Sequence, residues 1–237
     1  MSKRKEKDII LVIDLEATCW EDGKKPEGMV SEIIEIGISG IDYYTKEIRL
    51  RDTIIVKPEH STVSEFCTGL TTLTQEYVDE HGVSFEEACN ILRTKFKSKD
   101  RMWMSWGEYD KNQIERDCKL KNVKYPMGRT HNNAKALFSF AYGLPKELGV
   151  GMALDHLGLE FNGIAHRGID DAENIAKIIN KIFVPLIDEN TYGKKIRKEH
   201  QVLDDYLQDK YKDGILDGNV ARIVNKNTPQ DPDKSMR

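Results

Sequence analysis

The chain has 237 residues, of which 32% are charged and 39% hydrophobic, and its formal net charge is −4. This length suits one domain with extensions, and folding buries roughly 70% of the unfolded surface of such a chain, which is enough for a full core. The sequence contains no apolar run of about 18 residues, so it predicts no membrane-spanning helix. Its net charge argues against a large basic surface of the DNA-packaging kind.

The four cysteines are widely spaced and form no CxxC pair, which is typical of reduced thiols rather than of a zinc site. The apolar run at 9–13 is too short for a secretory signal and ends at Asp14. We therefore expect a cytoplasmic protein.

The first half of the chain predicts strands. Residues 9–16, IILVIDLE, form a β-branched run that is typical of a buried strand. Residues 31–41 alternate apolar and other side chains with period two, and residues 48–57 form a third extended run. Three consecutive strands with short links predict an antiparallel meander.

From residue 85 onward the apolar pattern changes to a helical period. It predicts one strand at 101–106 and helices at 85–97, 110–121, 131–142, 146–158 and 170–183. Strands followed by alternating helices and strands indicate an α/β domain, with a central mixed β-sheet flanked by helices. We place this domain at residues 8–185.

The two ends of the chain differ from this domain in composition. Residues 1–7 predict a basic N-terminal tail, and residues 186–222 predict a charged helical extension. Residues 223–237 are polar, contain two prolines, and predict a tail.

Two acids close the first strand. Asp14 and Glu16 are two residues apart, so they point to the same face of the strand. Two carboxylates beside a core repel each other, and burying them is costly without compensation. This pattern indicates a divalent-metal site, with an exposed strand end as the alternative. Glu35 lies inside the next apolar strand, and we interpret it as a structural acid.

Other polar residues follow later elements. Asp110 opens the helix after the strand at 101–106, where an acid is also a favoured helix-starting residue. In the last strong helix, Asp171 shares a face with Ile175, which turns it toward the core, and the helical phase predicts that Asp170 faces solvent. His166 precedes this helix and is a candidate general base.

This constellation resembles the DEDDh group of 3′-to-5′ exonucleases, in the stretches VIDLEATCW (12–20), WGEYDKNQ (106–113) and HRGIDDAENIAKI (166–178). Further stretches are similar to the branch that contains KapD-like proteins and the histone-mRNA 3′-exonucleases: EIIEIG (32–37), IIVKP (54–58) and FCTGLTTLTQEYVD (66–79). The resemblance covers about residues 8–184, and Arg167 after the histidine is a departure from it.

The resemblance implies a ribonuclease-H-like fold and hydrolysis of single-stranded RNA from its 3′ end to nucleoside 5′-monophosphates. It implies that two divalent cations, Mg²⁺ or Mn²⁺, bind to Asp14, Glu16, Asp110 and Asp171. It also implies that His166 removes the proton from the attacking water.

The sequence also suggests residues that contact the substrate, and it leaves two alternative functions open. In the family, the residues after the first acids line the pocket of the 3′-terminal nucleotide, which here are Ala17, Thr18 and Cys19. Apolar side chains that either stack on bases or belong to the core are Phe66, Leu70 and Trp106. The alternatives are a DNA exonuclease with the same chemistry, and a non-catalytic nucleic-acid-binding module that retains the fold.

Overall fold

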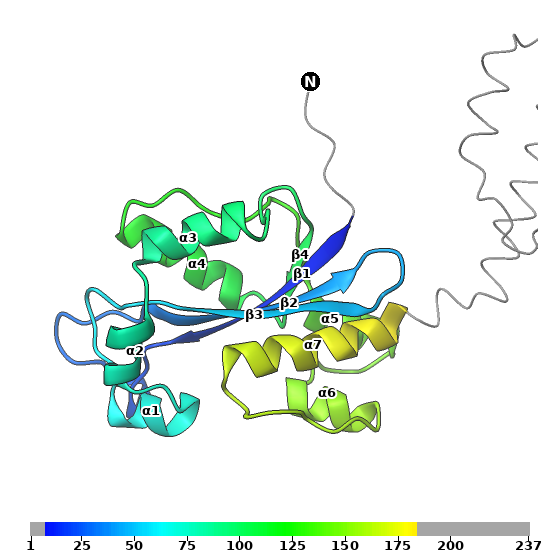
Figure 1. Cartoon of the computed structure of the whole chain (residues 1–237). Helices are drawn as coiled ribbons and strands as arrows, with labels where there is room; N and C mark the ends of the chain where they lie inside the picture. The colour runs from blue at the N-terminus through cyan, green and yellow to red at the C-terminus, as the bar shows by residue number, and fades with distance from the viewer. Residues whose placement is uncertain (1–7, 184–237) are drawn as a thin grey trace, which may run out of the picture. The chain divides into compact units, whose positions relative to one another are not determined.

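The computed structural model describes residues 8–183 and has a five-stranded mixed sheet in the order β3-β2-β1-β4-β5, flanked by helices (Figure 1). The strands are β1 (Ile9–Ala17), β2 (Ile33–Asp42), β3 (Ile48–Ile55), β4 (Trp103–Ser105) and β5 (His131–Asn133). The first three form the predicted antiparallel meander, whereas β4 runs parallel to β1, and β5 parallel to β4. The α/β class expected from the sequence is confirmed.

Helices cover both faces of the sheet (Figure 1). One face carries α3 (Phe85–Thr94) and α4 (Tyr109–Leu120), and the other carries α7 (Gly168–Phe183). The shorter helices are α1 (Glu65–Thr71), α2 (Gln75–His81), α5 (Ala134–Ala141) and α6 (Val150–His156), with a 3₁₀ turn at Glu21–Gly23. Among residues 8–183, no helix combines the length and apolarity needed to cross a membrane.

Alternation along β1 divides the core between the two faces. Leu11 and Ile13 pack with α3 and α4, whereas Ile10 and Val12 pack with α7. Because side chains two apart share a face, the acids Asp14 and Glu16 continue the row of Ile10 and Val12. The β1 acids therefore lie on the α7 side of the sheet.

Several sequence-based boundaries change in the structure. The helix predicted at 131–142 is wrong at its start, because residues 131–133 pair with β4 as strand β5 before α5 begins at Ala134. The helix predicted at 146–158 is α6, at Val150–His156. Helices α1 and α2 have seven residues each, which is too few for a helical period to stand out.

The predicted tails at 1–7 and 223–237 and the extension at 186–222 lie outside the described residues. The domain boundary at 185 stays a prediction.

Candidate active site

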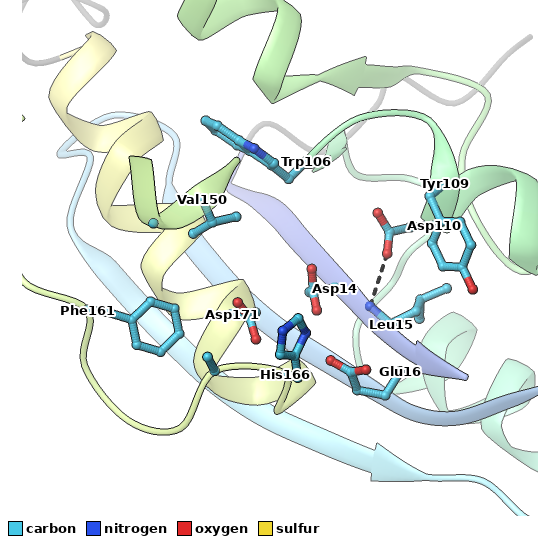
Figure 2. Close-up of a pocket in the computed structure, with 12 residues that line it drawn as sticks. Asp14, Leu15, Glu16, Trp106, Tyr109, Asp110, Val150, Phe161, His166 and Asp171 are labelled. Carbon is cyan, nitrogen blue, oxygen red and sulfur yellow. Dashed lines mark hydrogen bonds between the residues drawn. The ribbon is translucent and has the colours of Figure 1, made fainter. Parts of the chain in front are cut away.

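Three carboxylates from the end of β1 and the start of α7 meet on one face of the sheet. One oxygen from each of Asp14, Glu16 and Asp171 can be chosen so that all three lie within 4.8 Å of one another. Figure 2 shows these acids, with His166, around a common space. The pocket they help to line has a volume of about 380 Å³.

A close approach of two glycines places the start of α7 against the sheet. Gly37 on β2 pairs with Asp14 on β1, and an added Cβ at Gly37 would lie 1.9 Å from the carbonyl carbon of Gly168. Since real Cβ atoms never come so close, no side chain fits at position 37 without moving α7. This contact sets the first turn of α7, and with it Asp171, beside the β1 acids.

Asp110 enters the site from the first turn of α4. Its side chain is buried, and its Oδ1 accepts a hydrogen bond of 3.0 Å from the backbone N–H of Leu15. β4 pairs with β1 only at Leu11 and Val12, so the N–H of Leu15 has no strand partner on that side. The Asp110 carboxylate accepts the hydrogen bond of this N–H instead. The dashed line in Figure 2 marks this bond, which fixes Asp110 beside Asp14 and Glu16.

His166 lies in the loop before α7 and lines the same pocket. Its residue is exposed, and its backbone has a left-handed φ of 62°, which is uncommon outside glycine. The residue is therefore open to solvent, in contrast to the buried Glu16 and Asp110.

The acids repel one another at short range. Burial, together with the charges of Asp110 and Asp171, raises the pKa of Asp14 well above its ordinary value. Burial and the charge of Asp171 raise the pKa of Glu16 to about 9. Burial is also the main cause that raises the pKa of Asp110 and that of Asp171 to about 6.

This arrangement fits a hard divalent cation. The Oδ2 atom of Asp171 is buried and has no hydrogen-bond partner in the described part of the chain. The side chain of Asp171 also lies beside two other acids. A cation neutralises such repulsion and uses the free oxygen, and a donor set made only of carboxylates suits Mg²⁺ or Mn²⁺ rather than zinc.

The prediction that Asp170 faces solvent is wrong. Asp170 is only 8% exposed, its Oδ2 accepts a 2.9 Å bond from the N–H of Ile164, and its Oδ1 pairs with Arg51. The loop before α7 and Arg51 of β3 contact this side of the helix. The helical period of the sequence describes only the helix itself, so it does not predict these contacts. Asp170 is thus a structural acid, while its neighbour Asp171 lines the pocket.

The predicted substrate contacts separate into three groups. Trp106 lines the pocket, where its ring packs against Phe138 and its Nε1 donates to the carbonyl of Leu148 at 2.9 Å. Phe66 and Leu70 are 45% and 37% exposed on α1, so they are available for contact rather than part of the core.

Ala17 and Thr18 are buried directly after the β1 acids, and Cys19 is half-buried. The Thr18 hydroxyl accepts a bond from the Glu32 N–H at 3.0 Å, which gives Thr18 a structural role. Burial raises the pKa of the Cys19 thiol to about 12, which keeps it protonated.

Sequence reasoning missed three side chains that complete the wall of the pocket, Tyr109, Val150 and Phe161. Tyr109 is adjacent to Asp110, which was its only sequence signal. Val150 and Phe161 come from the segments around α6, and only the packing of those segments beside α7 brings them to the acids.

Comparisons with known proteins agree with this geometry. A family model for exonucleases, RNase T, matches residues 11–179. The 3′-5′ exoribonuclease 1 of Homo sapiens is 32% identical over 183 residues, which cover 72% of this chain and 51% of that protein. KapD of Bacillus subtilis (strain 168) is 24% identical over 174 residues, which cover 73% of this chain and 83% of KapD. The chain thus spans about half the length of the rat and human 3′-5′ exoribonuclease 1.

Among solved structures, the nuclease domain of 3′hExo, a DEDDh family member bound to rAMP, aligns with a TM-score of 0.67 at 30% identity. The alignment covers 76% of this chain and 93% of that domain. The ribonuclease-H-like fold and the relationship to DEDDh exonucleases expected from the sequence are confirmed.

Proposed function

We propose that this chain, which belongs to the RNase T exonuclease family, is a DEDDh-type 3′-to-5′ exonuclease that acts on the 3′ end of single-stranded RNA. The exoribonuclease names of its relatives and the rAMP bound to the 3′hExo domain support RNA. The observation that carries the proposal is the meeting of three carboxylates and an exposed histidine in one pocket.

The acids are the residues that would hold the metal. We assign Asp14, Glu16 and Asp171, with Asp110 beside them, as the binding site for two divalent cations, Mg²⁺ or Mn²⁺. Bound there, such ions supply positive charge that acidifies a water molecule and stabilises the leaving oxygen of a phosphodiester.

His166 supplies the proton acceptor. A ring nitrogen takes the proton of the attacking water, the new bond forms between the water oxygen and phosphorus, and the bond from phosphorus to the 3′ oxygen breaks. That 3′ oxygen gains a proton and becomes the new chain end, and the released nucleotide keeps its phosphate as a 5′-monophosphate. An exposed ring in a loop suits this step, because proton transfer onward to solvent is unobstructed.

Apolar walls hold the nucleotide. Trp106 and Phe161 line the pocket and offer ring faces near the acids, and Phe66 and Leu70 extend exposed apolar surface along α1. Stacking on such faces tolerates any base, so these side chains orient the 3′ end without reading its sequence.

Single-turnover kinetics on a 5′-labelled RNA test the proposal. His166→Ala is expected to slow cleavage by about 10²–10⁴-fold, the usual range for a positioned general base, while RNA affinity is retained because the acids remain. His60→Ala is the matched control, since His60 is exposed and lies outside the pocket. Near-normal cleavage by the His166 variant contradicts the assignment of the base.

Matched RNA and DNA oligonucleotides test the substrate. We expect faster shortening of the RNA, a descending ladder from the 5′ label, and suppression of cleavage by a 3′-terminal phosphate. Faster digestion of the DNA overturns the RNA assignment and leaves the 3′-to-5′ chemistry intact.

A further inference from the structure

Arg167, the residue between His166 and the start of α7, has no part in the site described so far. Its guanidinium turns to Glu35 on β2, with Nε 3.2 Å from Oε2 and Nη2 3.4 Å from Oε1. A third nitrogen, Nη1, lies 3.3 Å from the hydroxyl of Thr72, which follows α1. One side chain thus connects the histidine loop to the sheet and to α1.

Glu35 is a rigid anchor for this contact. Its side chain is fully buried, and its Oε1 accepts a 2.9 Å bond from the hydroxyl of Thr53 on β3. Its Oε2 accepts a 3.0 Å bond from the backbone N–H of Gly168, the first residue of α7. A single carboxylate therefore holds the two residues that directly follow His166.

The backbone of Arg167 is also fixed. Its N–H donates to the carbonyl of Ile164 at 3.2 Å, and its own carbonyl accepts the N–H groups of Asp170 at 2.8 Å and Asp171 at 2.9 Å. By contrast, residues 162–166 are all exposed. The side chain of Arg167 therefore ties an otherwise exposed loop to the sheet, in addition to the bonds of Asn162 and Ile164 to α7.

His166 needs such support because its left-handed φ of 62° is unfavourable for a side chain with a Cβ. A conformation of this kind persists only where the surroundings impose it. The bonds of Arg167 and Gly168 to Glu35 begin at the very next residue, so they restrict the direction in which the histidine ring leaves the chain.

Charge balance adds a reason for an arginine at this place. Glu35 pairs with Glu16 across the β1–β2 ladder, so it lies next to the acid cluster. The Arg167 cation offsets that extra negative charge, and it opposes the rise in the pKa of Glu16. The anchor therefore holds the loop without adding net charge beneath the metal-binding acids.

We propose that Arg167 is a positioning residue, and that its ion pair with buried Glu35 fixes His166 over the acids for proton transfer. This inference rests on the proposed role of His166. Arg167 itself does not touch the reacting atoms: it acts through the backbone of the histidine loop.

A double-mutant cycle separates this role from ordinary structural support. The variants are Arg167→Ala, His166→Ala and the combination of both, measured by single-turnover cleavage of saturating RNA with Mg²⁺. Arg167→Ala alone is expected to slow cleavage by about 10–100-fold, the scale seen when a group that orients a catalytic residue is lost. In the His166→Ala background the same change is expected to alter the rate by less than about twofold, because no base is left to position.

Two further quantities are measured for each variant: the RNA affinity and the Mg²⁺ concentration that gives half-maximal rate. Both are expected to stay within about threefold of the parent values in Arg167→Ala, because the acids stay in place. Arg167→Lys keeps the charge beside Glu35 but gives up the planar two-nitrogen contact. This variant is expected to slow cleavage by about 3–10-fold with His166 present and to have no effect without it. If Arg167→Ala does not fold, Arg167→Lys replaces it in the double-mutant cycle.

Two results overturn the inference alone: a parental rate in both Arg167 variants, or an equal loss with and without His166. A parental rate in His166→Ala, or no RNA cleavage by the parent protein, overturns instead the proposed function on which the inference rests.

Discussion

Glu16 and Glu35 are direct neighbours on adjacent strands, and they do opposite things. They are register partners between β1 and β2, so their side chains share one face of the sheet. Glu35 is fully buried and receives bonds from Thr53, Arg167 and Gly168. Glu16 is 9% exposed and has no hydrogen-bond partner among residues 8–183, and its nearest neighbours are other acids.

The contrast shows what distinguishes a structural acid from a functional one. Both side chains lie largely inside the protein, so burial alone does not separate the two roles. Donors converge on Glu35, whereas acids surround Glu16, where burial and the charge of Asp171 raise the pKa to about 9. A buried carboxylate surrounded by carboxylates is stable in its charged form only with a cation, and that is the property a metal-dependent nuclease requires.

The largest effect is expected from neutralising the functional member of the pair. Glu16→Gln should slow RNA cleavage by about 10²–10³-fold or more, the cost of removing one electrostatic stabiliser of the transition state. The same change should raise the melting temperature in EDTA near neutral pH, because it removes the cost of keeping a buried carboxyl protonated above its ordinary pKa. Single-turnover kinetics and thermal unfolding measure the two effects. A variant that is both inactive and less stable contradicts the distinction drawn here.

The adjacent acids of α7 repeat the contrast one residue apart. Asp171→Asn should also cost about 10²–10³-fold in cleavage rate, since Asp171 belongs to the acid cluster. Asp170→Asn should keep the rate within about tenfold and lower stability by about 1 kcal/mol, since it weakens bonds to Arg51 and Ile164. Parallel kinetics and denaturant unfolding of the two variants check this, and equal loss of activity in both refutes it.

Neutralising the structural member of the strand pair should act on stability. Glu35→Gln leaves Arg167 and the N–H of Gly168 with a weaker partner and should destabilise the protein by about 1–3 kcal/mol. Urea unfolding measures the difference in the free energy of unfolding, provided that its dependence on urea concentration is the same in both proteins. An unchanged midpoint would show that the bonds to Glu35 contribute little.

The metal-free protein should also show a pH-dependent stability. Burial and repulsion raise the pKa of Asp171 from 3.8 to about 6 and that of Glu16 from 4.5 to about 9. The folded state then binds these protons more tightly than the unfolded chain, so their contribution to stability is complete below about pH 4 and is lost as the pH rises through about 6 and about 9. In EDTA we therefore expect a lower melting temperature at about pH 8 than at about pH 5, measured by thermal unfolding at the two pH values.

Mg²⁺ should reverse this dependence. It binds the ionised carboxylates of the folded state, so it should raise the melting temperature more at the higher pH than at the lower one. Glu16→Gln serves as the control, because it removes the group whose pKa is raised furthest among those given a value in the acid cluster. Equal stabilisation by Mg²⁺ at both pH values would argue against a metal site made of these acids.

Much of this architecture was predictable from local pattern. A β-branched run located β1, a period-two run β2 and a third extended run β3, and a helical stripe located α7, because each pattern depends only on residues close together in the chain. The spacing of Asp14 and Glu16 placed both on one face for the same reason. Sequence position made Asp110 and His166 candidates, and the resemblance to DEDDh exonucleases supplied their roles, which stay predictions. Both residues lie in the same pocket.

Other features depended on contacts between distant segments, and no local pattern contains them. Asp170 is buried because Arg51, 119 residues away in the chain, and the loop before α7 close over it. Residues 131–133 form a strand because β4 offers an edge, and α1 and α2 are too short to show a period. Glu35 and Glu16 look alike in the sequence, and only the fold decides which acid receives donors and which remains free for a cation, because hydrogen bonds and repulsion act through space rather than along the chain.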